Sequence, residues 1–185
     1  MAGIELSPEQ LEKFIGLLVN YIEEQRKHYR PAAAPLPPSQ RTGLAKFFPA
    51  AIMDTRVLKL EGERVPNPEF LSVLKIMGIG PLLDPSSLPA VTFVDVIVFQ
   101  VPYTPEMLFH ELVHAEQFRQ LGTQKFMQHY VKGFLASGRF EDILLERHGF
   151  ELARRYAQQP QEAFSVAAAV QAWIEQQYRA ASTKH

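Results

Sequence analysis

The chain contains no cysteine, and this absence removes several kinds of chemistry. It allows no disulfide framework and no thiol nucleophile, so any metal must be held by histidine and carboxylate side chains. No uncharged apolar run reaches the length that spans a membrane. The first residues, MAGIELSPEQ, show no basic segment followed by an apolar one, so we expect a cytoplasmic protein, although a chain without cysteine also suits the periplasm.

The sequence also lacks an excess of charge of either sign. Its 19 basic and 20 acidic residues give a formal net charge of −1. Surfaces that bind nucleic acid or acidic membranes need an excess of lysine and arginine, so we expect neither as a partner. The chain has 185 residues, of which 46% are hydrophobic, enough for one core and too few for two. We predict an N-terminal helix and arm over residues 1–40 and a single-core metal-binding domain over residues 41–185.

The N-terminal part is predicted to be a helix followed by an extended connector. Ser7 as a cap and Pro8 at the first helical position begin a helix that should end near Tyr29. The next ten residues, PAAAPLPPSQ, contain repeated proline, which removes backbone donors and favours an extended arm over residues 31–40. Such an arm would let the first helix cover a cleft in the main body.

The main body is predicted to be a mainly helical α+β domain with a small β-sheet. TRVLKLEG reads as a strand, NPEFLSVLKIM as a short helix, and AVTFVDVIVFQV, residues 90–101, as a strand or hairpin rich in β-branched residues. Thr104 and Pro105 then begin a helix that Gly122 should end. Further helices are expected over residues 123–136, 139–158 and 160–181.

The helix that follows the predicted hairpin contains the pattern HELVH. Each residue of an α-helix turns by about 100°, so His110 and His114 lie roughly 40° apart and one turn along the axis, close enough to bind one ion. Zinc held by two imidazoles takes a third protein ligand and leaves a position for water. Glu111 is displaced around the helix and is placed to accept the proton of that water. We predict that His110 and His114 bind Zn²⁺ and that Glu111 is the catalytic base.

The third ligand has to come from another helix. On a helical wheel of FEDILLERHGFELARRY, Glu146 lies within the apolar arc, whereas Glu151 falls among arginines on the polar face. A carboxylate in a buried stripe needs a charged partner, a hydrogen bond or a metal, so Glu146 is the predicted ligand and Glu151 the alternative. His129 does not have the spacing of the metzincin third ligand. A buried ion pair of Glu146 with Arg119 or Arg139 is the competing explanation.

Two further roles follow from position, and one stays open. Gln117 lies about one turn beyond His114 on the same face, so it either orients a ligand or is a solvent-exposed amide. Hydrolysis also needs a donor that stabilises the developing oxyanion. The candidates are Tyr103, Tyr130, His129 and His148, and the sequence does not choose among them.

The motif and the downstream LLERHGFELARRY together resemble the gluzincin branch of the zincin metallopeptidases. More closely, TFVDVIVF followed by LFHELVHAEQFRQLG resembles compact bacterial zincin-like domains of unknown function, over about residues 55–156. The match is specific at His110, Glu111, His114 and Gln117. It is looser before Glu146, where those domains have proline and this chain has leucine. The resemblance implies a minimal zincin-like fold and a sheet-edge strand, within residues 90–101, that aligns an extended peptide.

These observations predict a zinc-dependent hydrolase of the metallopeptidase type with a peptide or protein as its substrate. Water activated by the metal would attack the peptide bond, with Glu111 as general base. Two alternatives remain. One is a binding protein that keeps the zincin scaffold and a metal but turns over no peptide. The other is a metal-free helical domain in which HELVH occurs by chance.

Overall fold

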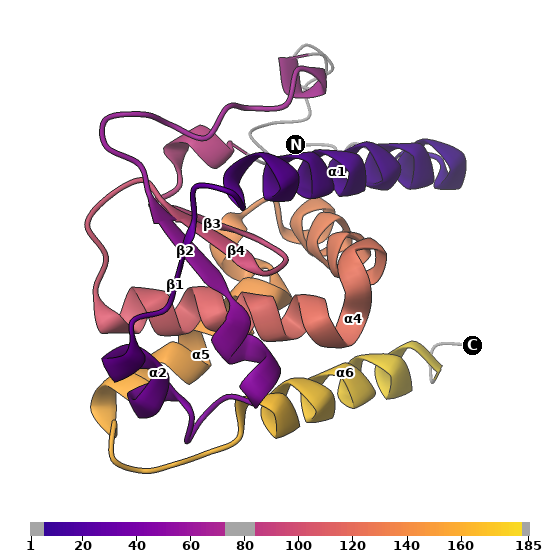
Figure 1. Ribbon diagram of the computed structural model, residues 1–185. Helices are drawn as coiled ribbons and strands as arrows, with labels where there is room; N and C mark the ends of the chain where they lie inside the picture. Colours follow the sequence, from indigo (N-terminus) through magenta and orange to yellow (C-terminus); the bar gives the residue numbers. More distant parts are fainter. Residues whose placement is uncertain (1–5, 73–83, 183–185) are drawn as a thin grey trace.

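The structure, a computed structural model, describes residues 6–72 and 84–182 (Figure 1). Most of these residues are helical, and a small mixed sheet lies among the helices, which confirms the predicted α+β class. In chain order the elements are α1 (Pro8–Tyr29), β1 (Ala34–Pro35), α2 (Pro38–Leu44), η1 (Ala50–Asp54), β2 (Arg56–Lys59), η2 (Pro85–Ser87), β3 (Ala90–Phe93), β4 (Val96–Phe99), α4 (Pro105–Ser137), η3 (Phe140–Asp142), α5 (Leu144–Gln158) and α6 (Val166–Ser182). No helix of the described ranges has both the length and the apolar character that crossing a bilayer requires.

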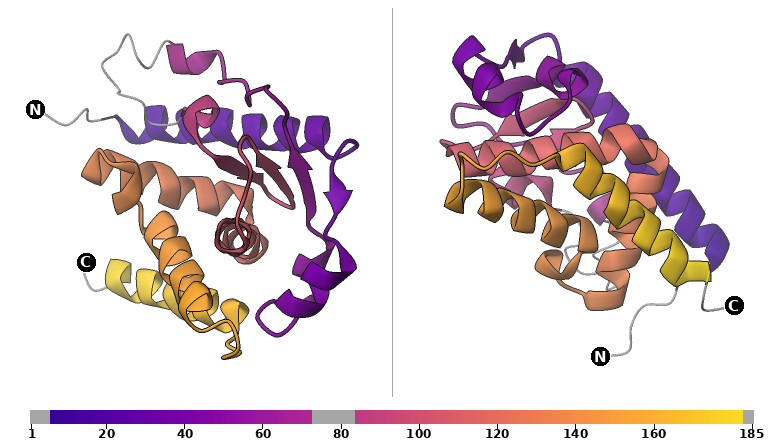
Figure 2. Two further views of the ribbon diagram at one scale, coloured as in Figure 1. Left: turned by 90° about the vertical axis from the view of Figure 1, so that its left-hand side faces the viewer. Right: turned by 90° about the horizontal axis from the view of Figure 1, so that it is seen from below.

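The sheet has the strand order β1-β2-β4-β3. Strands β3 and β4 form an antiparallel hairpin that pairs Ala90 with Phe99 and Phe93 with Val96, whereas β2 runs parallel to β4. All four residues of β4 are buried, so both faces of the sheet are covered. Figures 1 and 2 show α1 on one side of the sheet and α4 on the other. The predicted hairpin is confirmed, and β3 lies at the sheet edge.

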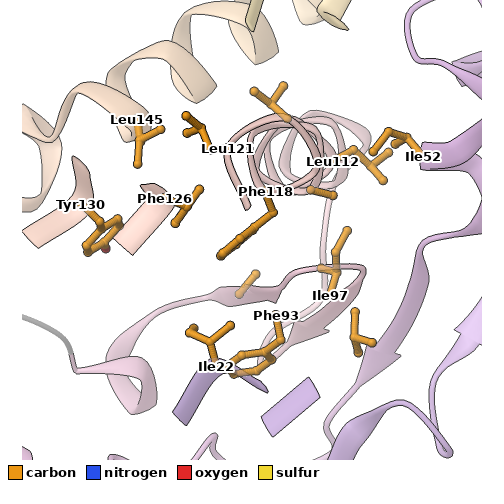
Figure 3. Packing of buried hydrophobic residues seen from close by; sticks show 14 of the residues in the cluster. Ile22, Ile52, Phe93, Ile97, Leu112, Phe118, Leu121, Phe126, Tyr130 and Leu145 are labelled. Carbon is orange, nitrogen blue, oxygen red and sulfur yellow. The ribbon is translucent and has the colours of Figure 1, made fainter. Parts of the chain in front are cut away.

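The hydrophobic core joins α1 to the rest of the chain. Leu18 and Ile22 of α1 are buried in the same cluster as Phe93 and Ile97 of the hairpin and Leu112 of α4 (Figure 3). The ring of Phe93 also stacks on that of Tyr29. Removal of α1 would therefore expose this core, so deletion of the first forty residues would test the stability of the domain as well as any role of the helix at a cleft.

Polar contacts fix the position of α1 against the sheet. Arg26 donates from Nε to Oδ1 of Asp95 at 2.6 Å, and Arg30 forms a second ion pair with the same carboxylate in the β3–β4 turn. The hydroxyl of Tyr21 donates to the carbonyl oxygen of Pro66 at 2.8 Å. These contacts hold α1 in one orientation relative to β3.

Several predicted boundaries are confirmed and others are wrong. The helix predicted over residues 139–158 begins only at Leu144, because Ile143 is extended and residues 140–142 form the short 3-10 helix η3. Ser7 caps α1 and Thr104 caps α4, as predicted. The arm is not extended as far as residue 40, because α2 begins at Pro38, where a missing N–H costs a helix nothing. The last helix begins at Val166 and not at residue 160, because Ser165 supplies its cap by accepting from the backbone N–H of Ala168. Residues 73–77 of the helix predicted over 67–77 lie outside the described residues.

Gly122 divides α4 into two segments. Its φ of 71° and ψ of 161° are not helical, and the following segment runs to Ser137 in a new direction. A positive φ favours glycine because other residues are strained there. The predicted break at Gly122 and the helix directly after it are therefore confirmed, and the change of direction brings residues 123–137 beside the same pocket as His110.

Candidate metal centre

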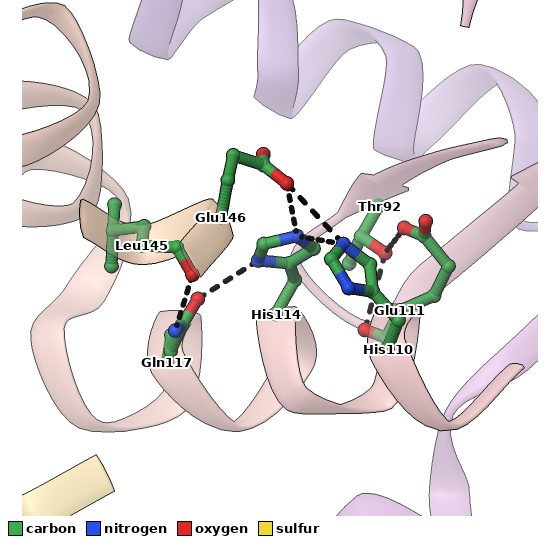
Figure 4. A network of polar contacts seen from close by, with 7 residues as sticks. All are labelled: Thr92, His110, Glu111, His114, Gln117, Leu145 and Glu146. Carbon is green, nitrogen blue, oxygen red and sulfur yellow. Dashed lines mark hydrogen bonds and ion pairs between the residues drawn. The ribbon is translucent and has the colours of Figure 1, made fainter. Parts of the chain in front are cut away.

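The helices α4 and α5 bring the three predicted ligands together (Figure 4). Nε2 of His110 lies 2.9 Å from Nε2 of His114, and Oε2 of Glu146 lies 3.2 Å from both nitrogens. All three side chains are buried and offer one ligand atom each to a common point. The wheel argument thus placed Glu146 on the inward face correctly, and the three side chains form a cluster that could bind a metal.

The spacing of these atoms fits a tetrahedral ion. Ligand bonds of 2.0–2.2 Å place neighbouring ligand atoms roughly 3.3–3.6 Å apart in such a site. The separations from Glu146 are close to this range, and the His110–His114 separation is a few tenths of an ångström shorter. Two nitrogens and one carboxylate oxygen are also a donor set that suits divalent transition metals. The described residues therefore provide three side chains whose chemistry and spacing could hold a metal ion.

Gln117 fixes the tautomer of His114. Its Oε1 lies 2.8 Å from Nδ1 of His114, and its Nε2 donates to the carbonyl oxygen of Leu145 at 3.2 Å. Because the amide nitrogen is committed to Leu145, the amide oxygen faces His114 and must accept from Nδ1–H. The lone pair of a neutral His114 is then on Nε2, which points at the cluster. Gln117 is fully buried and contacts His114, so the exposed alternative is wrong.

The charges of the cluster depend on one another. Burial by itself lowers the pKa of His114, but the Glu146 carboxylate outweighs burial and raises this pKa to about 9. Burial favours the protonated form of Glu146, yet the two histidines hold its pKa well below the ordinary value. In the absence of a cation, His114 therefore carries a proton between the ligand atoms at neutral pH. A divalent ion would replace this proton and use the same lone pairs.

Glu111 lies beside the cluster and is not part of it. Its Oε2 accepts a hydrogen bond from Thr92 Oγ1 at 2.7 Å, and the same hydroxyl lies 3.3 Å from the Glu111 carbonyl oxygen. Thr92 comes from the edge strand β3, so the sheet positions the carboxylate from outside its own helix (Figure 4). The sequence analysis missed Thr92, because a threonine inside a strand is typical of any sheet.

The structure does not support the competing explanations for Glu146, which were Glu151 as the third ligand and an ion pair with Arg119 or Arg139. Glu151 is exposed on the outer face of α5. Arg119 pairs with Glu116 at 2.7 Å, and Arg139 lies near Glu141 and Asp142. Neither arginine therefore supplies the buried ion pair that competed with metal binding.

His129 and His148 are also separate from the cluster. The ring of His148 is parallel to that of Trp173 on α6, and His129 meets the same indole at an angle of 60°. Neither histidine lines the pocket beside the cluster. Of the histidines in the part of the chain that the structure describes, only His110 and His114 join the metal-binding group.

Gly149 of α5 is a further residue of the site that sequence reasoning missed. A Cβ atom at this position would lie 2.9 Å from Cε1 and 3.1 Å from Nδ1 of His110. Real Cβ contacts essentially never come so close, so the His110 ring would have to move. The absence of a side chain on α5 thus permits the position that His110 occupies.

If the cluster binds a metal ion, we expect Gly149→Ala to weaken its affinity for Zn²⁺ by about tenfold or more, because metal sites tolerate ligand shifts of only about 0.5 Å. Competition against a chromophoric chelator measures this affinity. Gly133→Ala is the matched control, since its Cβ would meet Ile143 at an ordinary 3.5 Å. Equal zinc affinities of the two variants would contradict this role of Gly149.

No protein family, no curated protein and no solved structure matches this chain. The resemblance to gluzincins therefore depends on the motif and on the geometry of the cluster. What the structure adds to the motif is the convergence of two histidines and one carboxylate, a fixed tautomer and a hydrogen-bonded carboxylate beside them.

Proposed function

We propose that the protein is a zinc-dependent hydrolase that cleaves peptide bonds. The observation that carries this proposal is the position of Glu111, a buried carboxylate that adjoins the three ligand side chains and is held by Thr92 without joining the cluster. A site that binds metal only for stability has no need of such a group. A base beside the ligands is what hydrolysis by activated water requires.

Each residue of the site has a separate part in the proposed reaction. A zinc ion held by His110, His114 and Glu146 would act as a Lewis acid and lower the pKa of a bound water towards neutrality. Glu111 takes up a proton from the attacking water and then delivers it to the amine that leaves. Thr92 keeps the Glu111 carboxylate turned towards the pocket. Gln117 keeps the Nδ1 proton of His114 away from the ligand position.

Tyr130 is the donor best placed to stabilise the oxyanion. Of the four candidates from the sequence, only Tyr130 lines the pocket that contains the cluster. Tyr103 instead stacks on Phe99. Burial, with smaller effects of Glu146 and Glu111, raises the pKa of Tyr130 well above its ordinary value. Its phenol therefore stays protonated at neutral pH and can donate a hydrogen bond to a carbonyl oxygen.

We expect Tyr130→Phe to lower kcat by roughly 100-fold or more, the usual cost of removing one oxyanion donor, with little change in zinc content. Steady-state kinetics on one peptide and metal analysis of the same preparation give both quantities. Tyr103→Phe removes a hydroxyl from a tyrosine outside this pocket and is the control. Equal kcat values for the two variants would show that Tyr130 has no role in the reaction.

The central experiment uses the full chain purified without a histidine tag. We expect about one equivalent of bound zinc, hydrolysis of an unfolded protein substrate, loss of hydrolysis with a chelator and recovery with added zinc. Less than about half an equivalent under zinc-replete conditions would contradict the metal centre. Stoichiometric zinc with no cleavage of any peptide or unfolded protein would contradict the enzyme and support a binding protein on the same scaffold.

A further inference from the structure

A pocket of about 250 Å³ adjoins the candidate metal centre. Its polar lining includes His110, His114, Glu146 and Glu111. The described lining residues include no lysine and no arginine, the side chains that most often bind a carboxylate or phosphate of a ligand. The greater part of the lining is apolar, which suits an uncharged, hydrophobic group.

The size of the pocket limits what this group can be. An apolar cavity of about 150 Å³ is enough to hold one benzene ring, and pockets for drug-sized ligands begin near 300 Å³. A volume between these limits fits one large side chain, such as that of leucine or phenylalanine, together with part of the backbone that carries it. It leaves no room for several large residues side by side.

Helix α1 forms one wall of the pocket. Leu18 and Ile22 line it, and both are buried. The facing wall comes from residues 123–137 of α4, which contribute Phe126 and Met127 after the break at Gly122. Figure 3 shows Ile22 and Phe126 around the same region of the core. Because α1 lies outside the residues that resemble zincins, this wall belongs to the present chain and not to the motif.

The wall is fixed and not a loose cover. Tyr21, between Leu18 and Ile22, donates from its hydroxyl to the carbonyl oxygen of Pro66 and also lines the pocket. One turn after Ile22, Arg26 is paired with Asp95 of the hairpin. These contacts fix the distance between α1 and the candidate metal centre. A pocket can select side chains by size only if its walls are held in this way.

The rim of the pocket is also apolar. Phe150 of α5 lines the pocket, keeps 44% of its surface exposed and lies with its ring 4.4 Å from that of His110. Large exposed aromatic residues often mark binding surfaces, and this one adjoins a predicted metal ligand. A substrate that reaches the metal centre would pass an aromatic side chain at the rim before it meets the apolar interior.

From these observations we propose that this pocket binds a large apolar side chain next to the scissile amide, and that Ile22 and Leu18 of α1 set the upper limit of its size. The preferred substrates are peptides with leucine or phenylalanine beside the bond that is cleaved. Peptides with aspartate at that position are excluded, because the described lining contains Glu106, Glu111 and Glu146 and no lysine or arginine. This inference rests on the proposed hydrolase for its scissile bond, but the preference of the pocket can be measured by binding alone.

The first test compares peptides that differ only at the residues flanking one bond. For the zinc-loaded protein, we expect kcat/KM for leucine or phenylalanine to exceed that for alanine by roughly 10- to 200-fold, the range that hydrophobic pockets achieve. Aspartate peptides should be the poorest substrates. Cleavage that is fastest with alanine, lysine or aspartate would overturn the inference while leaving the hydrolase intact.

The second test changes the wall. Ile22→Ala enlarges the pocket, so the kcat/KM of a tryptophan peptide relative to a leucine peptide should rise by about tenfold. Ile15→Ala removes the same atoms from a buried position of α1 that does not line the pocket, and should leave this ratio at the wild-type value. Because both variants lose core packing, a ratio that changes equally in the two would show that Ile22 sets no size limit.

A binding measurement separates this inference from the proposed activity. Glu111→Gln protein loaded with zinc should bind the leucine peptide at least about tenfold more tightly than the alanine peptide in calorimetry. If this preference is found and the wild type cleaves no peptide, the inference about the pocket is supported and the proposed hydrolase activity is contradicted. If the wild type cleaves peptides and the Glu111→Gln protein binds both alike, the hydrolase stands and the pocket inference fails.

Discussion

Replacement of Glu111 by glutamine is expected to leave bound zinc unchanged and to lower peptide hydrolysis by about 1000-fold. The amide keeps the size of the side chain and can still accept from Thr92 Oγ1, but it cannot take up a proton. General base catalysis contributes roughly 10²- to 10⁴-fold, and the expected loss lies in the middle of this range. Zinc content by elemental analysis and kcat/KM on one peptide, measured on the same sample, provide the two quantities.

Glu151→Gln is the control for this change. It makes the same chemical substitution on the exposed face of α5, away from the pocket. Both zinc content and kcat/KM should equal those of the wild type. If Glu111→Gln retains zinc and also retains full activity, Glu111 is not the base. Loss of zinc from Glu111→Gln would mean that this residue supports the metal and would remove the observation on which the proposed function depends.

Glu146→Ala is expected to weaken zinc binding by at least about 100-fold. Residues that merely support a ligand already contribute 10- to 100-fold, and Glu146 is one of three side chains that offer a ligand atom. Removal of this carboxylate also leaves His114 without the charge that raises its pKa. The apparent dissociation constant should be measured by competition at one fixed pH, so that proton competition is the same for all proteins.

Glu151→Ala is the matched variant for this experiment, because both residues are glutamates of α5 and only Glu146 faces His110 and His114. We expect the zinc affinity of Glu151→Ala to match the wild type. If only the Glu151 change weakens zinc binding, the assignment of the third ligand is wrong. Thermal unfolding of both proteins in a chelator would detect any general loss of stability from the buried substitution.

Local patterns in the sequence were sufficient to predict the ligand cluster. The four-residue spacing of His110 and His114 follows from helical geometry alone. The position of Glu146 within an apolar arc indicated that this carboxylate faces inward, and it is 4% exposed. Gln117 was recognised because one helical turn brings it to the face of His114. Each of these inferences needed only the period of a single helix.

Contacts between segments that are distant in the sequence could not be predicted from the period of a single helix. Thr92 and Glu111 are joined across a strand and a helix, and Gly149 matters because α5 approaches His110 closely. Tyr130 could not be chosen from four candidates until the break at Gly122 had been placed in space. The wrong boundaries at α2 and α6 arose where a proline or a serine could serve either a loop or a helix start.

The sequence by itself determined the chemistry that the site offers: the absence of cysteine left histidine and carboxylate as the possible metal ligands, and helical periodicity placed two histidines and one glutamate on inward faces. The tertiary structure decided what surrounds that chemistry. It placed α1 against the pocket, turned the second half of α4 to face it, and set β3 behind Glu111. The physical reason is that the period of one helix fixes which residues share a face, whereas the packing of different elements fixes which faces meet.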